Sequence, residues 1–313
     1  MRSPCPTPTV PARSLLDVDD LSPAELVAVL DRAVAFGETL PPRDLLAGVP
    51  VLNLFFEAST RTATSFTLAE QRVGADVISF APGASSLGKG ETIADTALTL
   101  HGIGVRVIVV RHQESGFARR LADVFEGHVI NAGDGTHAHP TQALLDLMTL
   151  RQEFGRFDGL RVAIVGDILH SRVARSNIVG MRMLGIDVTL VGPPTLLPAA
   201  FARSGVRIER DFDAVLPQVD AVMMLRIQRE RITGGLLASI DDYTQRYQLN
   251  RARLHALDAA AVILHPGPYN RGVELTDDVL DDPRSRYVAQ VHNGVFVRMA
   301  VLDLLVNGAP VAA

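Results

Sequence analysis

The chain has 313 residues, of which 47% are hydrophobic and 21% are charged. This composition is typical of a soluble globular protein, and the length is enough for two domains of ordinary size. The formal net charge of -5 argues against a non-specific nucleic-acid binder, which would carry a basic excess. No stretch approaches the ~20 apolar residues of a membrane span, so we expect no membrane partner.

The single cysteine, Cys5, lies in a proline-rich leader, residues 1–14, which we expect to form a tail. One cysteine cannot build a disulfide or a multi-cysteine metal site within the chain, and a reducing compartment is its natural setting. The leader lacks the apolar segment of a secretory signal. We therefore predict a cytoplasmic protein.

Strand and helix patterns alternate along the first half of the chain. Ser22 is predicted to cap a helix that begins at Pro23, with Glu25 in its first turn. Apolar runs predict strands at residues 50–56, 77–80, 105–110 and 129–132. Helical spacing or capping residues predict helices at residues 64–74, 93–100, 117–125 and 140–151.

The second half repeats this alternation, with strands predicted at residues 161–165, 187–191, 221–225 and 260–264 and helices at 173–184 and 295–305. Alternation in both halves predicts an α/β fold with two doubly wound parallel-sheet domains of similar size, residues 15–150 and 151–294. We expect a C-terminal helix, residues 295–313, to pack back on the first domain. Ligands of such sheets bind at the carboxyl ends of strands.

One position stands out in the count of basic residues. Lys89 is the only lysine among the 30 lysines and arginines of the chain. It lies in a small, glycine-flanked loop, residues 85–92, which lets backbone and side chain approach a ligand closely. Lysine and arginine differ where a compact ammonium is needed, so the loop favours a functional role over chance survival of one lysine.

A hydroxyl-rich turn follows the strand predicted at residues 50–56. It contains Ser59, Thr60, Arg61 and Thr62. Hydroxyls, a guanidinium and the amides of a helix N-terminus suit a phosphate, although an ordinary Ser/Thr helix cap is the alternative. Arg111 and His112 follow another apolar strand and form a weaker basic pair.

Residues 131–142 form a polar loop that runs into a helix. His139 and Gln142 are three positions apart, so both can face one site. His137 and His139 suggest a metal only poorly, because no acidic partner or third ligand lies at suitable spacing. We therefore predict no metal and no cofactor.

The second half adds three motifs at strand ends. Residues 166–176 open a helix after a strand but lack the glycine pattern of a dinucleotide site, and Arg172 there suits a carboxylate. Arg226 and Gln228 have period-two spacing and could point the same way, although a solvated helix start is the alternative. Residues 265–268 form a rigid turn with few amide donors, whose carbonyls can accept hydrogen bonds.

Three motifs together resemble those of the aspartate/ornithine transcarbamoylase family: residues 59–62, 139–142 and 265–268, in this order on two α/β halves. The resemblance extends from Leu15 to Leu305 and is closest to the catalytic chains of the aspartate members. It implies transfer of the carbamoyl group from carbamoyl phosphate to L-aspartate, giving N-carbamoyl-L-aspartate and phosphate in pyrimidine (UMP) synthesis. Residues 15–150 would bind carbamoyl phosphate and residues 151–294 aspartate.

The same resemblance implies roles for single residues. The phosphate would be held by side chains from the first half: Ser59, Thr60, Arg61, Thr62, Ser86 and Arg111. The carbonyl oxygen would be contacted by Thr62, Arg111 and His139. The carbamoyl amine would be held by Gln142 and the turn formed by Pro266, Gly267 and Pro268. The aspartate would be bound by Lys89, Arg172, Arg226 and Gln228.

These residue types suit attack by an amine on an acyl carbon. Negative charge develops on the carbonyl oxygen, and Thr62, Arg111 and His139 would stabilise it without a covalent intermediate. Lys89 would be a further catalytic cation, one that reaches the phosphate and a carboxylate together. In this family, the loop with Ser86 and Lys89 reaches the neighbouring subunit's site, which implies a homotrimer. Regulatory or dihydroorotase-like chains are possible further partners.

Two departures and two rivals remain open at this point. Ala63 and Thr67 stand where many relatives carry arginine and glutamate. An ornithine or other amino-acid carbamoyltransferase shares the phosphate half, but the ornithine enzyme typically carries a cysteine near the final turn, and residues 265–268 contain none. An inactive, transcarbamoylase-like assembly subunit is the second rival, against which the intact candidate residues argue.

Overall fold

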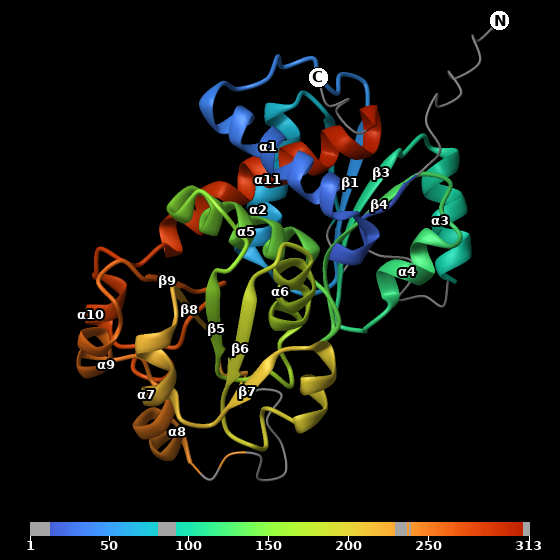
Figure 1. Cartoon of the computed structure of the whole chain (residues 1–313). Coiled ribbons are helices and arrows are strands. Elements are labelled where there is room, and N and C mark those ends of the chain that lie inside the picture. The colour runs from blue at the N-terminus through green and yellow to red at the C-terminus, as the bar shows by residue number, and fades with distance from the viewer. Residues whose placement is uncertain (1–12, 81–91, 229–236, 238, 309–313) are drawn as a thin grey trace, which may run out of the picture. The chain divides into compact units, whose positions relative to one another are not determined.

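The computed structural model describes residues 13–80, 92–228, 237 and 239–308 (Figure 1). By its contacts the chain forms two compact units. Unit 1 runs up to Gly135 and takes up the chain again from Val295, and unit 2 is Thr136–Gly294. We expected the domain boundary near residue 150, and these bounds stay a prediction. By contacts, the helix before residue 150 groups with unit 2.

Unit 1 is built on a four-stranded, fully parallel sheet. Its strands, in the order β2-β1-β3-β4, are β1 Pro50–Phe55, β2 Asp76–Phe80, β3 Val107–His112 and β4 His128–Asp134. Its helices before residue 135 are α1 Pro23–Glu38, α2 Thr60–Arg72, α3 Ile93–Gly102 and α4 Phe117–Ala122. The first four residues of β3 are fully buried, as in parallel sheets covered on both faces.

Unit 2 contains a five-stranded parallel sheet in the order β7-β6-β5-β8-β9. The strands are β5 Arg161–Val165, β6 Asp187–Val191, β7 Arg207–Glu209, β8 Ala221–Met224 and β9 Val262–Leu264. The helices are α5 Pro140–Phe154, α6 Arg172–Met183, α7 Phe212–Val215, α8 Ile240–Tyr247, α9 Arg251–Ala256 and α10 Asp277–Leu280. The predicted α/β class with parallel sheets is confirmed.

The last helix, α11 Tyr287–Asn307, begins in unit 2 and ends in unit 1. Within unit 1, Arg32 Nε lies 2.8 Å from Asp303 Oδ2, and the Arg298 guanidinium lies 4.9 Å from the centre of the Phe66 ring. The predicted packing of the C-terminal helix on the first domain is confirmed. The helix begins eight residues earlier than the predicted start at residue 295.

By length and composition α11 could cross a membrane, because its mean hydropathy reaches 1.2. We did not expect any segment to pass this test. However, 78% of the apolar window is buried inside the molecule. Burial at this level is what a core helix requires, since its apolar surface packs against protein rather than lipid.

Local capping explains where several helices begin. Ser22 accepts a hydrogen bond from the Glu25 amide, and Glu25 in turn accepts from the Ser22 amide, so the predicted cap of α1 is confirmed as a capping box. Helix α2 begins at Thr60 rather than at the predicted residue 64. Residues 60–62 are thus the first turn of a helix and not the loop before it.

Candidate functional site

Each sheet reverses its strand order at one place, between β1 and β3 in unit 1 and between β5 and β8 in unit 2. Ligands of doubly wound folds bind at the carboxyl ends of the strands at this point. The turn at residues 59–62 follows β1, and Arg111 is in the last two residues of β3. Arg172 follows β5, and Arg226 and Gln228 follow β8.

The first turn of α2 presents donors that are not used for capping. Ser59 is the N-cap residue of this 13-residue helix, but its side chain makes no capping hydrogen bond. The amides of Thr60, Arg61 and Thr62 belong to the first turn, where amides have no partner within the helix. Arg61 is exposed and Thr62 is buried. This arrangement suits an anion.

Arg111 is held in place by groups of unit 1. Its Nε lies 3.2 Å from Glu57 Oε2, and its Nη1 donates to the carbonyl oxygen of Ala132 at 3.3 Å. Glu57 was not among the predicted residues, although it lies two positions before Ser59. Its acidic side chain beside a hydroxyl-rich turn was the available signal.

His112 does not share the role of Arg111. Its ring stacks on Phe117, with centroids 3.9 Å apart, and meets the Phe56 ring edge-on. Its Nδ1 accepts a hydrogen bond from the Glu114 amide at 3.0 Å. Burial lowers the pKa of His112, so the neutral ring is favoured. The predicted basic pair therefore has one site candidate and one packing residue.

In unit 2, the start of α5 carries His139 and Gln142. His139 is the N-cap residue, and its amide donates to Ser176 Oγ at 3.0 Å. Gln142 donates through Nε2 to Asp146 Oδ1 at 2.9 Å. Both side chains are buried, His139 at the N-cap and Gln142 in the first turn of the same helix.

The loop after β5 is tightly built. Gly166 has φ 126, and a Cβ atom there would meet the Leu225 carbonyl oxygen at 3.0 Å, so a glycine is needed where the two loops approach. The buried carboxylate of Asp167 lies 2.9 Å from His170 Nδ1. Burial raises the pKa of Asp167, an effect that His170 opposes. Neither Asp167 nor His170 was predicted.

Arg172 is the first residue of α6 and is 9% exposed. Residues 225–228 are not helical, which is against the alternative of a helix start directly after β8. Gln228 Nε2 donates to the His170 carbonyl oxygen at 3.0 Å, so the loops after β5 and β8 are joined. Arg226 is half-buried.

The turn after β9 contains two prolines, and the role of its carbonyl groups as ligand acceptors stays a prediction. The peptide bond between Gly267 and Pro268 is cis. The His265 amide donates to Gln290 Oε1 at 2.9 Å, and the Gly267 amide donates to His265 Nδ1 at 2.8 Å. Because the turn's amides are bonded within the protein, Pro266 and Gly267 offer a ligand mainly acceptors.

Some predicted features fall elsewhere. Ser86 and Lys89 lie outside the described residues. Ala63 and Thr67 are half-buried and four positions apart on α2, so they share one helix face. Within the described ranges there is no group of three or more His, Cys, Asp or Glu side chains that could hold a metal ion.

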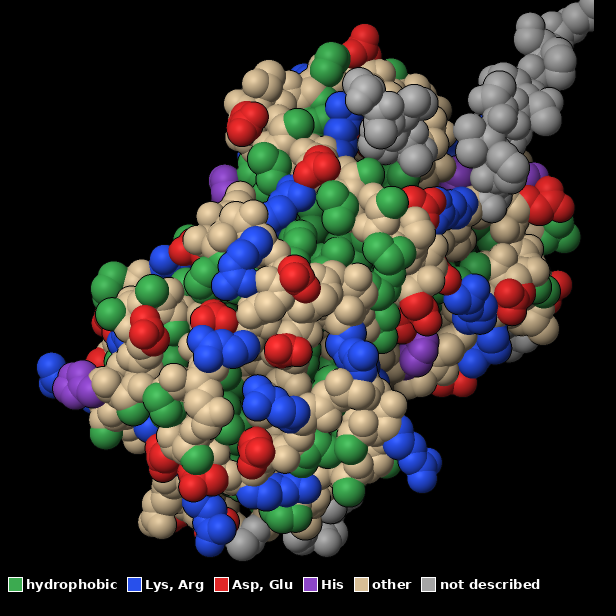
Figure 2. All heavy atoms as spheres, viewed as in Figure 1, with side chains coloured by type: hydrophobic (Ala, Val, Ile, Leu, Met, Phe, Trp, Pro, Cys, Tyr) green, Lys and Arg blue, Asp and Glu red, His purple; other side chains and the backbone are tan. Residues whose placement is uncertain are grey.

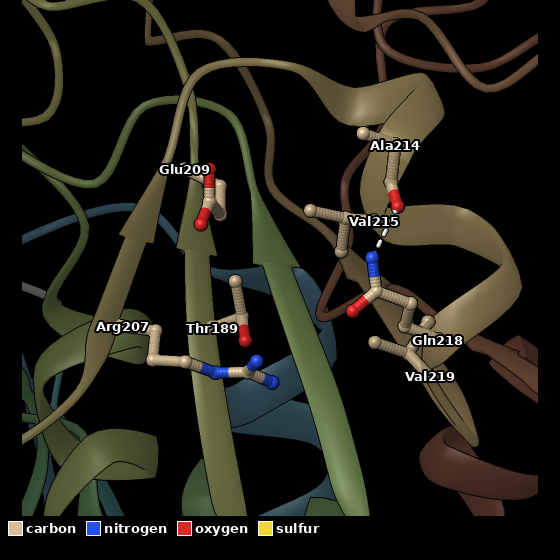
Figure 3. A pocket seen from close by; sticks show the side chains of 7 residues that line it. All are labelled: Thr189, Arg207, Glu209, Ala214, Val215, Gln218 and Val219. Carbon is tan, nitrogen blue, oxygen red and sulfur yellow. Dashed lines mark hydrogen bonds between the residues drawn. The ribbon is translucent and has the colours of Figure 1, made fainter.

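The surface and cavities add context. On the face drawn in Figure 2, arginines are interspersed with acidic side chains rather than massed into one patch. Figure 3 shows a cavity of about 110 Å³ in unit 2, lined by β6, β7 and the turns around α7, where Gln218 Nε2 donates to the Ala214 carbonyl oxygen. Thr189 and Arg207 line it, but none of the predicted site residues does.

Comparison with known proteins identifies the class. The model of the aspartate/ornithine carbamoyltransferase carbamoyl-phosphate-binding domain matches residues 13–152, and that of the Asp/Orn-binding domain of the same family matches residues 158–305. The chain belongs to the aspartate/ornithine carbamoyltransferase family, and its enzyme class is that of the carbamoyltransferases.

Individual relatives point to one branch. The aspartate carbamoyltransferase catalytic subunit of Acidothermus cellulolyticus is 52% identical over 300 residues, which cover 95% of this chain and 93% of that protein. The aspartate transcarbamoylase of Trypanosoma cruzi, solved with N-(phosphonacetyl)-L-aspartic acid, matches with a TM-score of 0.86 and 33% identity, covering 95% of this chain and 97% of that one. The ornithine carbamoyltransferase of Thermus thermophilus matches with a TM-score of 0.84 and 29% identity, covering 95% of this chain and all of that one (100%). The fold alone therefore does not separate the two branches, whereas sequence identity favours aspartate.

Proposed function

We propose that this chain transfers the carbamoyl group of carbamoyl phosphate to the amine of L-aspartate, in the pyrimidine (UMP) pathway of the cytoplasm. One observation carries the proposal: the chain is 52% identical over 300 residues to an aspartate carbamoyltransferase catalytic subunit. A helix start that suits an anion in unit 1 and two arginines at the strand-order reversal of unit 2 support it.

The phosphate of carbamoyl phosphate would bind to donors of unit 1. These are the hydroxyls, first-turn amides and guanidinium groups of Ser59, Thr60, Arg61, Thr62 and Arg111, joined by Ser86. A helix N-terminus and a guanidinium both favour a multiply charged anion. The ion pair with Glu57 orients Arg111 before the anion arrives, which lowers the entropy cost of binding.

The reaction would proceed by direct attack. The aspartate amine attacks the carbonyl carbon of carbamoyl phosphate, and charge grows on the carbonyl oxygen in the tetrahedral state. Thr62, Arg111 and His139 donate to that oxygen, which stabilises the state more than the substrate. The carbon–oxygen bond to phosphate then breaks, and the leaving phosphate takes the amine proton.

The remaining roles fall to groups of unit 2 and to Lys89. Gln142 and the carbonyls of Pro266 and Gly267 would accept from the carbamoyl NH2 group, with Pro268 in the same turn. Arg172, Arg226, Gln228 and Lys89 would hold the two carboxylates of aspartate. A dicarboxylate suits two arginines, whereas the cationic side chain of ornithine does not.

A homotrimer with shared sites is part of the proposal. Its support is an apolar surface on both sides of residues 81–91 in the sequence. Strand β2 is at the sheet edge and exposes Ile78 (38%). Helix α3 buries only Ala97, whereas Leu98 (71%) and the C-cap residue Ile103 (70%) are exposed. Edge strands and apolar helices of this kind are usually covered by another chain.

An assay with carbamoyl phosphate and either L-aspartate or L-ornithine tests the activity. We expect turnover of carbamoyl phosphate with L-aspartate and none with L-ornithine. Turnover with ornithine, or with neither amino acid, would overturn the proposal, and the second result would favour the inactive assembly subunit.

Mixing inactive chains tests the shared site. We expect Lys89→Gln and His139→Ala trimers to regain activity after subunit exchange, because some mixed trimers contain a site with both residues intact. Native mass measurement verifies the trimer and the exchange. No recovery after verified exchange would contradict a site built from two subunits.

A further inference from the structure

Asp146 is a buried carboxylate that no step of the proposed reaction uses. It lies on α5, one helical turn after Gln142, and is 0% exposed. Its Oδ1 accepts from Gln142 Nε2 at 2.9 Å and from Gln290 Nε2 at 2.7 Å, and its Oδ2 accepts from Asn177 Nδ2 at 2.8 Å. At least three amide groups, from α5, α6 and α11, therefore converge on one carboxylate.

These contacts set the orientation of two glutamines. A side-chain amide has a donor end and an acceptor end, and a carboxylate accepts only. Because Gln142 and Gln290 both turn their NH2 groups toward Asp146, both carbonyl oxygens are turned away from it. In Gln290 that oxygen accepts from the His265 amide at 2.9 Å.

The same chain of bonds reaches the turn at residues 265–268. The His265 amide is engaged by Gln290, and the Gly267 amide by His265 Nδ1. The Gln142 oxygen and the carbonyls of Pro266 and Gly267 are the acceptors that the proposed function assigns to the carbamoyl amine. Asp146 accepts from the NH2 group of Gln142, which turns the Gln142 oxygen away from it, and it is linked through Gln290 to the turn that carries the other two carbonyls.

We propose that Asp146 is a positioning residue that gives the carbamoyl-amine subsite its selectivity for an NH2 group. The inference rests on the proposed function. Acetyl phosphate has a methyl group in place of the amine and nearly the same shape. Acceptors fixed toward that position favour the amine and leave buried oxygens unpaired against the methyl, which makes the methyl analogue bind weakly.

The test compares the affinities of the two phosphates for the whole enzyme by calorimetry. We expect wild type to bind carbamoyl phosphate at least ~10-fold more tightly than acetyl phosphate. Asp146→Leu, which keeps the branched shape with a larger side chain and removes both oxygens, should weaken carbamoyl phosphate by ~10–100-fold and acetyl phosphate by less than ~3-fold. Thermal melting verifies folding.

Two further variants keep the test decisive. Asp146→Asn can keep its oxygen toward both glutamines when its NH2 group faces Asn177 and the Asn177 amide turns over to accept through Oδ1. It should therefore recover most of the selectivity. If the leucine variant does not fold, Gln290→Met removes the link to His265 while Asp146 stays, and it should also reduce selectivity. Asn177→Ala, which touches Asp146 but neither glutamine, is the matched control with unchanged selectivity.

Equal weakening of both phosphates in the Leu and Met variants would overturn the inference, since a loosened fold affects both ligands alike. An Asn variant as unselective as the Leu variant would also overturn it. Absence of wild-type turnover with aspartate, or of wild-type binding of carbamoyl phosphate, would instead reject the proposed function. The two failures are therefore distinguishable.

Discussion

The carboxyl ends of the two sheets differ in how far their polar groups are already bonded. In unit 1, the Ser59 side chain makes no capping bond, and the first-turn amides of α2 have no partner within the helix. In unit 2, Gln142 and the turn after β9 are bonded through Asp146, Gln290 and His265. An anion is attracted by charge and unpaired donors, whereas a neutral amine needs acceptors held in one orientation.

Each unit also contains a buried carboxylate on a helix that carries candidate residues, and the two carboxylates differ in their surroundings. Glu70 on α2 accepts from Asn53 Nδ2 at 2.6 Å, and burial raises its pKa from 4.5 to about 7. Asp146 in unit 2 accepts from at least three amides. We infer that the carboxylate of unit 1 costs stability when it ionises, whereas that of unit 2 orders its neighbours.

The largest effect is expected from Arg111→Ala in unit 1. Loss of the guanidinium that we propose contacts both phosphate and carbonyl oxygen should lower kcat/KM by at least ~100-fold. Steady-state kinetics measure it, with the exposed Arg119→Ala as a control that should stay within ~3-fold of wild type. A fall in kcat/KM of less than ~10-fold for Arg111→Ala would contradict the idea that the positive charge of unit 1 binds the substrate.

Lys89→Arg should come next. The charge is kept, but a planar fork replaces a slim ammonium, so we expect loss of roughly nine-tenths of the activity or more with unchanged folding. Turnover and circular dichroism measure the two properties. Near-normal turnover would show that the single lysine is a chance feature of the composition and has no specific role.

Arg226→Ala should sharpen the difference between the units. Removing the proposed charge-assisted bond to a carboxylate of aspartate should raise the KM for aspartate by ~10–30-fold and leave the KM for carbamoyl phosphate within ~3-fold. Arg246→Ala, a mostly exposed arginine of unit 2, is the matched control. An equal rise in both constants would contradict the assignment of Arg226 to the amino acid.

Glu70→Gln should change stability and not activity. The folded chain binds the Glu70 proton more tightly than the unfolded chain, so stability is highest below about pH 4.5 and falls as pH rises toward 7. The free energy of unfolding falls by up to about 3 kcal/mol over this pH range. The glutamine variant should therefore be more stable than wild type at pH 8 and show little gain at pH 4.5, as measured by denaturant unfolding.

Glu25→Gln is the control, because the pKa of Glu25 is lowered whereas that of Glu70 is raised. Its bonds to Arg13 and Ser22 lower the pKa of Glu25 to about 2, so its stabilisation is present above the unfolded pKa and is lost as pH falls toward 2. The variant should lose stability about equally at pH 6 and pH 8. A Glu70→Gln gain that did not grow with pH would contradict the burial argument.

Much of the fold could be predicted because its signals are local. Strands β5 and β6 have the predicted bounds, since buried apolar runs are easily recognised. The start of α2 was predicted four residues too late, because Thr60 and Thr62 have weak helix propensity, although Thr62 is buried in the folded chain. Strand β7, with three mostly exposed residues, gives no apolar run to detect.

The candidate residues were selected from motifs, but their partners were not. Glu57 is close to Ser59 in sequence, and its bond to Arg111 spans 54 positions. Asp146 lies within a helix that was predicted correctly in kind, and its bond to Gln290 spans 144 positions. Such pairs leave no periodic pattern in the chain.

The sequence by itself determined the α/β alternation, the family and the residue types at the strand ends, because propensity, periodicity and motifs are local properties. Only the tertiary structure decided which side chains orient the candidates: Glu57 for Arg111, and Asp146 with Gln290 for Gln142 and the turn after β9. The physical reason is that burial and hydrogen-bond direction depend on neighbours that folding brings together from distant parts of the chain.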